Sequence, residues 1–247
     1  MTQSPATASR GTKLSERIAR RILHDVTRRG LAPGDMLPSE AKMIAEYGVG
    51  RASLREALRI LEINGLVTIK PGPGGGPVVG AVEPRGFGRS STLYLHVLGA
   101  TVGELVEARA VVEPVMARLA AEEADEAGRR RLRAVLAEGD AVGLDDDDAY
   151  HRVANEFHVL LLAPPGNRVL GLYAGALEGL FADRVSGGVL EPPQRRVALD
   201  QHRAIGEAVL AGDGDRAEEL ARHHMVETSE GIRRSHPGIL HQRIDWS

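Results

Sequence analysis

The sequence contains no cysteine, which excludes disulfide scaffolds, thiolate zinc sites, iron–sulfur clusters and cysteine nucleophiles. Aromatic residues make up only 3% of the chain, and runs of β-branched residues are scarce. No apolar stretch approaches the ~18 residues of a membrane span, and the first ten residues lack the apolar segment of a signal peptide. We therefore expect a helix-rich cytoplasmic protein that does not contact a membrane.

The net charge of −3 is the sum of two parts of the chain with opposite charge. Residues 1–82 contain 12 Lys and Arg against 7 Asp and Glu, a balance of +5. Of the totals of 31 and 34, this leaves 19 basic and 27 acidic residues for 83–247, a balance of −8. A basic block before an acidic one indicates that the first part meets a polyanion, although chance unevenness is the alternative.

Hydrophobic spacing and turn residues predict a mainly α protein with two domains. The N-terminal domain has the element order of a winged helix-turn-helix, namely three helices and a β-hairpin, and the C-terminal domain is an all-helical bundle. Its helices are expected near 101–123, 125–139, 147–162, 167–187, 194–211 and 213–233. The predicted divisions are a disordered N-terminus at 1–12, the DNA-binding domain at 13–82, a linker at 83–92, the bundle at 93–235 and a flexible tail at 236–247.

The third predicted helix, which starts near Arg51, has two distinct faces. Leu54, Ala57, Leu58 and Leu61 share one face at helical spacing. Arg51, Arg55 and Arg59, spaced by four, form a separate stripe. Such a helix can pack through the first face and place guanidinium groups in the major groove of DNA. The alternative is an ordinary solvated arginine face.

The stretch from Ile18 to Val79 resembles the DNA-binding domain of the GntR family of bacterial transcription regulators. The resemblance rests on residues 30–40 (GLAPGDMLPSE), 48–51 (GVGR), 54–58 (LREAL) and 64–67 (NGLV). It implies that Arg51, Ser53 and Arg55 contact bases or phosphates and that Gly72 marks the wing; Ser39 and Arg59 complete the candidate DNA-binding set. Two positions depart from the family pattern, because Ala41 replaces a frequent arginine and Gly50 a usual serine or threonine.

Three histidines lie next to apolar residues on three different predicted helices: His158, His202 and His224. Helices of a bundle can bring imidazoles to one interior point, and imidazole is the commonest ligand of zinc and nickel. From the pattern alone, a histidine on a helix is more often an ordinary core or surface residue.

Residues 101–225 resemble the FCD ligand-binding domain of the FadR-like subfamily, through 107–109 (EAR), Glu113, 157–158 (FH), 166–167 (GN), 202–205 (HRAI) and His224. The resemblance implies that His158, His202 and His224 hold a divalent metal (zinc or nickel) and contribute to effector binding. The family's usual aspartate, four residues before the first histidine, is Ala154 here, with Asn155 one residue out of register. His151 could substitute, or the histidines could bind an anionic ligand without a metal.

Arg109, on the first long helix of the bundle, has two interpretations. It could bind a carboxylate of the effector, or it could form a buried salt bridge with Glu113 at i+4.

These features together predict a ligand-responsive transcription repressor and not an enzyme. It is expected to bind a near-palindromic double-stranded DNA operator as a homodimer and to respond to a small carboxylate effector. The alternative is a metal-dependent hydrolase that uses the three histidines. That reaction needs a general base; no known hydrolase motif supplies one, and Glu156 is poorly placed on its helix.

Overall fold

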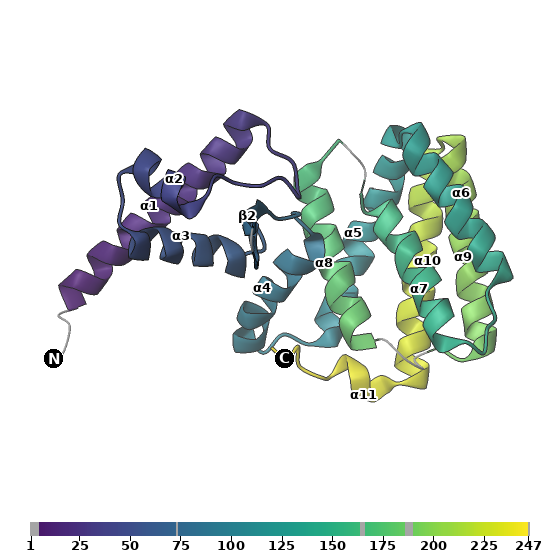
Figure 1. The fold of residues 1–247 in the computed structure, drawn as a ribbon. Coiled ribbons are helices and arrows are strands. Elements are labelled where there is room, and N and C mark those ends of the chain that lie inside the picture. Colours follow the sequence, from purple (N-terminus) through teal and green to yellow (C-terminus); the bar gives the residue numbers. More distant parts are fainter. Residues whose placement is uncertain (1–4, 73, 164–165, 186–189, 247) are drawn as a thin grey trace. The chain divides into compact units, whose positions relative to one another are not determined.

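The computed structural model describes residues 5–72, 74–163, 166–185 and 190–246. The chain divides into two compact units, residues 1–86 and 87–247. The first is a winged helix-turn-helix and the second a helical bundle, so the protein is mainly α, as the sequence predicts (Figure 1). Within the described ranges, no helix is both long and apolar enough to cross a membrane.

The first unit is built from α1 (Pro5–Arg29), α2 (Glu40–Tyr47), α3 (Arg51–Ile63), β1 (Val67–Lys70) and β2 (Gly76–Val79). The strands pair antiparallel, with Val67 opposite Val79 and Lys70 opposite Gly76. Gly48, at a φ of +66°, ends α2 in the left-handed conformation that glycine adopts without strain. This allows the tight turn that leads directly into α3.

The core of the first unit fixes the orientation of α3. Leu54, Ala57, Leu58 and Leu61 of α3 are buried, and α3 packs against α1 and α2. The apolar side chains that meet them are Ile18, Ile22, Leu37, Met43, Val67 and Val79. Burying one face of α3 leaves its arginines on the solvent side, as its two-faced sequence predicts.

The second unit contains α4 (Pro84–Leu98), α5 (Val102–Glu123), α6 (Glu126–Ala141), α7 (Asp147–Leu161), α8 (Arg168–Val185), α9 (Pro192–Ala211), α10 (Gly214–Ser235) and α11 (Pro237–Leu240). Helix α5 is central and contacts α7, α8, α9 and α10. A capping box starts it, in which Thr101 accepts from the Glu104 backbone N–H and Glu104 accepts from that of Thr101. Helix α10 packs against both α5 and α9. In Figure 1, α6 and α9 lie side by side at the right-hand side of this unit.

The structure differs from the prediction at both ends of the chain, where a disordered N-terminus and a flexible tail were expected. Helix α1 begins at Pro5, since proline is tolerated in a first helical turn; residues 1–4 lie outside the described ranges. The predicted tail contains α11, and beyond it Ile244 is only 1% exposed, packed with Leu105 and Leu180. The Ile244 N–H also donates to the Ala100 carbonyl at 2.8 Å. One buried isoleucine gives no periodic signal, so the sequence pattern could not reveal this docking.

The predicted linker, residues 83–92, is also helical, because α4 runs from Pro84 to Leu98. The division between the two units, at Gly86, falls within it. Gly88 lies within this predicted linker, but it is needed for packing. A Cβ at Gly88 would lie 3.1 Å from the carbonyl oxygen of Ala176 on α8. The glycine therefore permits a close helix–helix approach and does not mark a loop.

Candidate functional site

Helix α3 presents its arginines to solvent. Arg51, Arg55 and Arg59 are exposed, and Ser53 is partly buried. The Nε atom of Arg55 lies 3.2 Å from Glu40 Oε2 on α2. The Arg55 side chain nevertheless remains 67% exposed, so this ion pair orients the guanidinium group and leaves it accessible. Gly50, at the N-cap of α3, provides no side-chain cap.

The other two candidate DNA-binding residues lie near the ends of neighbouring elements. Ser39 is exposed and caps α2, where its hydroxyl accepts from the Lys42 N–H at 3.3 Å. Gly72 is exposed in the loop between β1 and β2 at a φ of +95°, a conformation that L side chains rarely adopt. Ser39 thus has a local structural role, and Gly72 shapes the hairpin loop.

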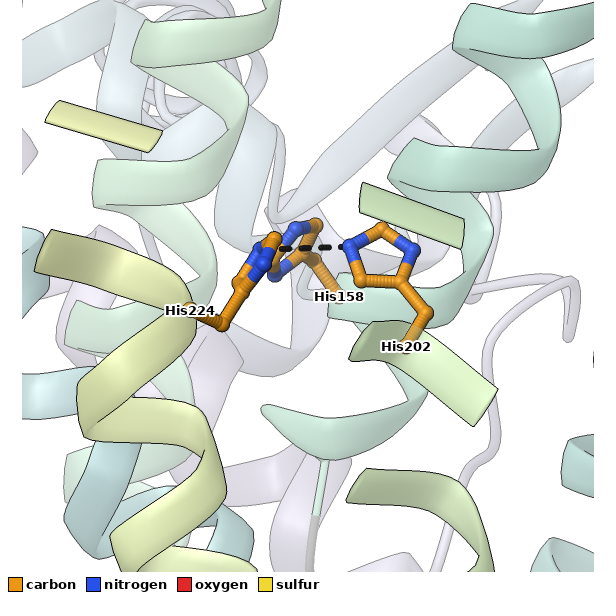
Figure 2. Close-up of side chains that lie close together, drawn as sticks. All are labelled: His158, His202 and His224. Carbon is orange, nitrogen blue, oxygen red and sulfur yellow. Dashed lines mark hydrogen bonds between the residues drawn. The ribbon is translucent and has the colours of Figure 1, made fainter. Parts of the chain in front are cut away.

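The three predicted histidines converge inside the second unit. His158 comes from α7, His202 from α9 and His224 from α10, and each is at least nine-tenths buried. One ring nitrogen from each lies within 4.8 Å of those of the other two. Figure 2 shows the rings facing one another, with His202 Nε2 3.2 Å from His224 Nε2. The ring of His202 also stacks on Phe157, with centroids 4.2 Å apart.

Hydrogen bonds select which nitrogen of His224 faces the cluster. The Nδ1–H of His224 donates to Gln201 Oε1 at 2.7 Å, which leaves an unprotonated Nε2 directed toward His202. Burial, together with the nearby His158, lowers the pKa of His224 to about 3. Burial also lowers the pKa of His202 well below its ordinary value. Both imidazoles are therefore neutral at pH 7, the form that ligates metal ions.

His158 has a different electrostatic environment. Its Nδ1 atom lies 2.8 Å from Glu113 Oε2. Burial alone would lower the pKa of His158, but the carboxylates of Glu113 and Glu178 outweigh it and raise that pKa. Burial likewise opposes ionisation of Glu113, yet Arg109 and His158 hold its pKa below the ordinary value. A carboxylate on the outer nitrogen of an imidazole fixes the ring and directs the other nitrogen to the cluster.

Arg109 is engaged by two buried carboxylates. Its Nε atom lies 2.6 Å from Glu113 Oε1, and its Nη2 atom lies 2.5 Å from Glu178 Oε2. The guanidinium carbon also lies 3.8 Å from the centroid of the Phe181 ring. Of the two interpretations of Arg109, the structure therefore contains the salt bridge with Glu113. The Nε and Nη2 groups of Arg109 are thus already engaged by carboxylates of this chain.

The three histidines, Arg109 and Glu178 line a cavity of about 70 Å³. Ala154, 9% exposed, also lines it, which places the position of the family's usual aspartate at the cavity wall. His151 and Asn155 contribute to the wall as well. However, the groups of described residues close enough to share a metal are His158, His202 and His224, and Glu113, His158 and Glu178. His151 belongs to neither, so its substitution for the aspartate is not supported.

The donor set fits a divalent transition metal. Three imidazoles with an open position are a known arrangement for zinc, and nickel also accepts imidazole ligands. Within the described part of the chain, four buried side-chain atoms have no hydrogen bond of good geometry: His158 Nδ1, which has only the ion-pair contact with Glu113, His202 Nδ1 and both oxygens of Glu178. Buried polar atoms without a hydrogen-bond partner are few in folded proteins, and a bound ion is one explanation for them. The sequence did not single out Glu178, although it is a lone carboxylate in an otherwise apolar stretch of α8 (AGALEGLFA).

Comparisons with known proteins agree with this architecture. Residues 14–75 match the model for "Bacterial regulatory proteins, gntR family", and residues 104–227 match the FCD domain. The HTH-type transcriptional repressor NanR of Escherichia coli (strain K12) is 30% identical over 227 residues, covering 88% of this chain and 83% of that protein. NanR of Citrobacter rodentium is 30% identical over 226 residues, covering 88% and 84%.

A solved structure of a Streptococcus agalactiae GntR protein has a TM-score of 0.69 at 23% identity. The structural match covers 87% of this chain and 99% of the Streptococcus agalactiae chain, and it supports the fold described above. The hydrolase alternative gains no support. The relatives named above are transcriptional repressors, and Glu156 pairs with Arg131 at 3.4 Å on a partly exposed surface.

Proposed function

The chain belongs to the gntR family of bacterial regulatory proteins and carries an FCD domain, and from this premise we propose that it is a ligand-responsive transcription repressor. It binds a near-palindromic double-stranded DNA operator as a homodimer, which places two α3 helices in successive major grooves. The observation that carries this proposal is the exposed stripe of Arg51, Arg55 and Arg59, opposite the buried face of α3.

Each candidate DNA-binding residue has a distinct role in the proposal. Arg51, Ser53 and Arg55, on the first half of α3, reach base edges or phosphates, while Arg59 contacts the phosphate backbone. The ion pair with Glu40 orients the Arg55 side chain in the DNA-free protein. Ser39 supports the start of α2, and Gly72 lets the wing approach the minor groove closely.

In the second unit, His158, His202 and His224 would hold a divalent metal, whose open position would accept a carboxylate of a small effector. Glu113 orients His158 through its Nδ1 atom, and Gln201 orients His224 in the same way. Effector binding favours one arrangement of the bundle and thereby changes operator affinity, because two ligands of one protein are thermodynamically coupled.

The test of the DNA-binding assignment is Arg55→Ala. DNA selected from a random library by the full chain is labelled, and its affinity is measured by fluorescence anisotropy at several salt concentrations. Loss of a base-contacting arginine should weaken specific binding by roughly 1–3 kcal/mol, about 5- to 150-fold, and relax specificity at one position.

The matched control is Arg133→Ala on α6, which removes an exposed arginine of the second unit and should leave affinity unchanged. Retention of full specific binding by Arg55→Ala would contradict the assigned role of α3. Native mass spectrometry of the wild-type chain measures subunit number, bound metal and retained ligand separately from the DNA assay.

A further inference from the structure

Glu178 stands out among the buried charges of the cavity. Its side chain is 2% exposed, and it reaches the cavity wall from α8. Within the described residues, Arg109 Nη2 is its ion-pair partner, and neither of its oxygens has a hydrogen bond of good geometry. Oε2 has the Arg109 guanidinium beside it, but Oε1 has no hydrogen-bond donor among the described residues. Burying a carboxylate oxygen without a donor is costly, so Oε1 is free to accept from an N–H or O–H group.

Arg109 can balance only one of the two carboxylate charges beside it. Its Nε atom is committed to Glu113, which also contacts His158. The guanidinium group carries one positive charge against two carboxylates. An incoming ligand carboxylate would therefore meet an arginine that is already neutralised, with Glu178 beside it.

The charge count then limits the ligand. With neutral histidines and a divalent cation on them, the cavity groups carry three positive and two negative charges. One ligand carboxylate brings the total to zero. A second would leave an uncompensated negative charge in a buried site, next to Glu178.

Resting on the function proposed above, we propose that the effector is a small hydroxylated monocarboxylate. Its carboxylate faces the three histidines, and a hydroxyl group donates to the oxygens of Glu178. Glu178 is thus a specificity-determining residue that accepts a hydroxyl and repels a second carboxylate. A water needs roughly 10–15 Å³, so the cavity of about 70 Å³ has room for about five waters or a ligand of similar size.

The test uses three acids of nearly equal size: 3-hydroxypropionate, propionate and malonate. Each is titrated calorimetrically into the full chain, loaded with one equivalent of zinc, and zinc content is measured before and after. We expect 3-hydroxypropionate to bind most tightly and malonate least. Free zinc favours malonate, because two carboxylates chelate it, so this order requires repulsion from the protein.

Glu178→Gln removes the charge and keeps the shape of the side chain. The preference for 3-hydroxypropionate over malonate should fall by about tenfold or more in this variant. The matched control is Glu138→Gln on α6, an exposed residue paired with Arg152, which should retain the wild-type preference. Circular dichroism and zinc content establish that each variant is folded and loaded.

Each outcome separates this inference from the function on which it rests. If all three acids bind but Glu178→Gln leaves their affinity ratio unchanged, the role of Glu178 is refuted and the carboxylate site survives. If none binds the zinc-loaded wild type, the carboxylate site and the role of Glu178 are both refuted, while the DNA-binding assignment, which Arg55→Ala tests separately, stands. β-Alanine, titrated in the same way as a further ligand, tests the hydroxyl group. Tighter binding of β-alanine than of 3-hydroxypropionate would show that the donor is a cation and overturn the hydroxyl assignment. Tighter binding of malonate than of 3-hydroxypropionate to the wild type would refute the inference without any variant.

Discussion

Replacing Arg109 by methionine separates its structural role from a role in ligand binding. Glu113 and Glu178 are 5% and 2% exposed and would lose their shared cation. Removing one partner of a buried ion pair costs roughly 3–5 kcal/mol, because the charge left behind has no compensation. For a chain of this length, that corresponds to a fall in the melting temperature of about 6 to 20 °C.

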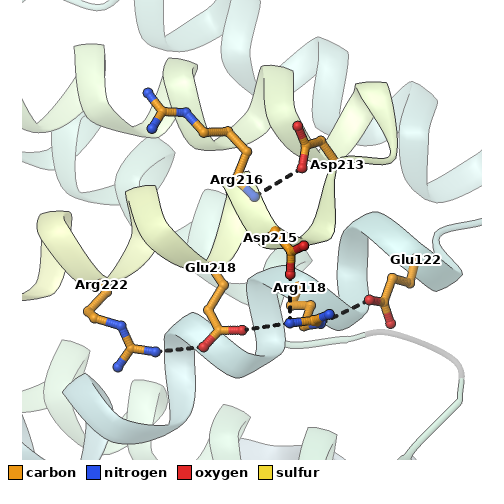
Figure 3. A network of polar contacts seen from close by, with 7 residues as sticks. All are labelled: Arg118, Glu122, Asp213, Asp215, Arg216, Glu218 and Arg222. Carbon is orange, nitrogen blue, oxygen red and sulfur yellow. Dashed lines mark hydrogen bonds and ion pairs between the residues drawn. The ribbon is translucent and has the colours of Figure 1, made fainter.

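The matched control is Arg118→Met, nine residues further along the same helix. Arg118 also has carboxylate neighbours: Glu122 at 3.0 Å, Asp215 at 2.9 Å and Glu218 at 3.4 Å (Figure 3). However, its side chain is 42% exposed, and exposed ion pairs contribute at most about 1 kcal/mol. The two arginines thus share the feature of several acidic partners and differ in how deeply their side chains are buried.

Calorimetric melting of the full chain at pH 7.5 measures both variants. We expect a large shift of the second unit's transition for Arg109→Met and a small one for Arg118→Met. Adding Glu178→Gln to Arg109→Met should recover part of the loss, since one uncompensated charge disappears. An Arg109→Met protein as stable as the wild type, with its response to carboxylates abolished, would refute the salt bridge and favour the ligand-anchor interpretation.

Two further substitutions test the tail and the metal site. Ile244→Ala removes a side chain that is 1% exposed and should destabilise the second unit by about 2–5 kcal/mol in denaturant unfolding. The control is Trp246→Ala, which removes an exposed side chain and should cost less than about 0.5 kcal/mol. An equally small loss for Ile244→Ala would mean that the tail does not dock. Ala154→Asp places a carboxylate on the cavity wall one turn before His158 and should tighten zinc binding about tenfold in competition with a chelator, through the added ligand charge. Its neutral counterpart Ala154→Asn should not, and equal affinities in the two variants would show that position 154 cannot reach the metal.

Local pattern accounts for most of the helices and for the two faces of α3. Helices α5 to α10 lie close to their predicted ranges because their apolar spacing is helical and because capping residues such as Asp125 and Gly212 mark several of their ends. The pattern failed at Gly88, where a glycine permits close packing in a helix, and at Ile244, where one side chain docks a segment. In both places, a tertiary contact overrides local propensity.

The histidine cluster shows a different limit. Spacing within a helix cannot bring together His158, His202 and His224, which lie on three helices, so their convergence was implied by the family resemblance alone. The Arg109–Glu113 pair was open to prediction, since i+4 spacing places both on one face of α5. Glu178 is 65 residues beyond Glu113 in the sequence, and no spacing rule connects them.

The buried cluster of Arg109, Glu113 and Glu178 is better explained by a role in function than by a contribution to stability. Apolar side chains of similar volume often stabilise a protein as well as a buried ion pair or better, and the bundle has an extensive apolar core elsewhere. The charged residues come from α5, α7 and α8, and α5 packs against both of the others. A ligand that changes the charge balance of the cavity therefore acts directly on contacts between these helices. Such differential contact is what a ligand needs to shift the conformational equilibrium of a regulator.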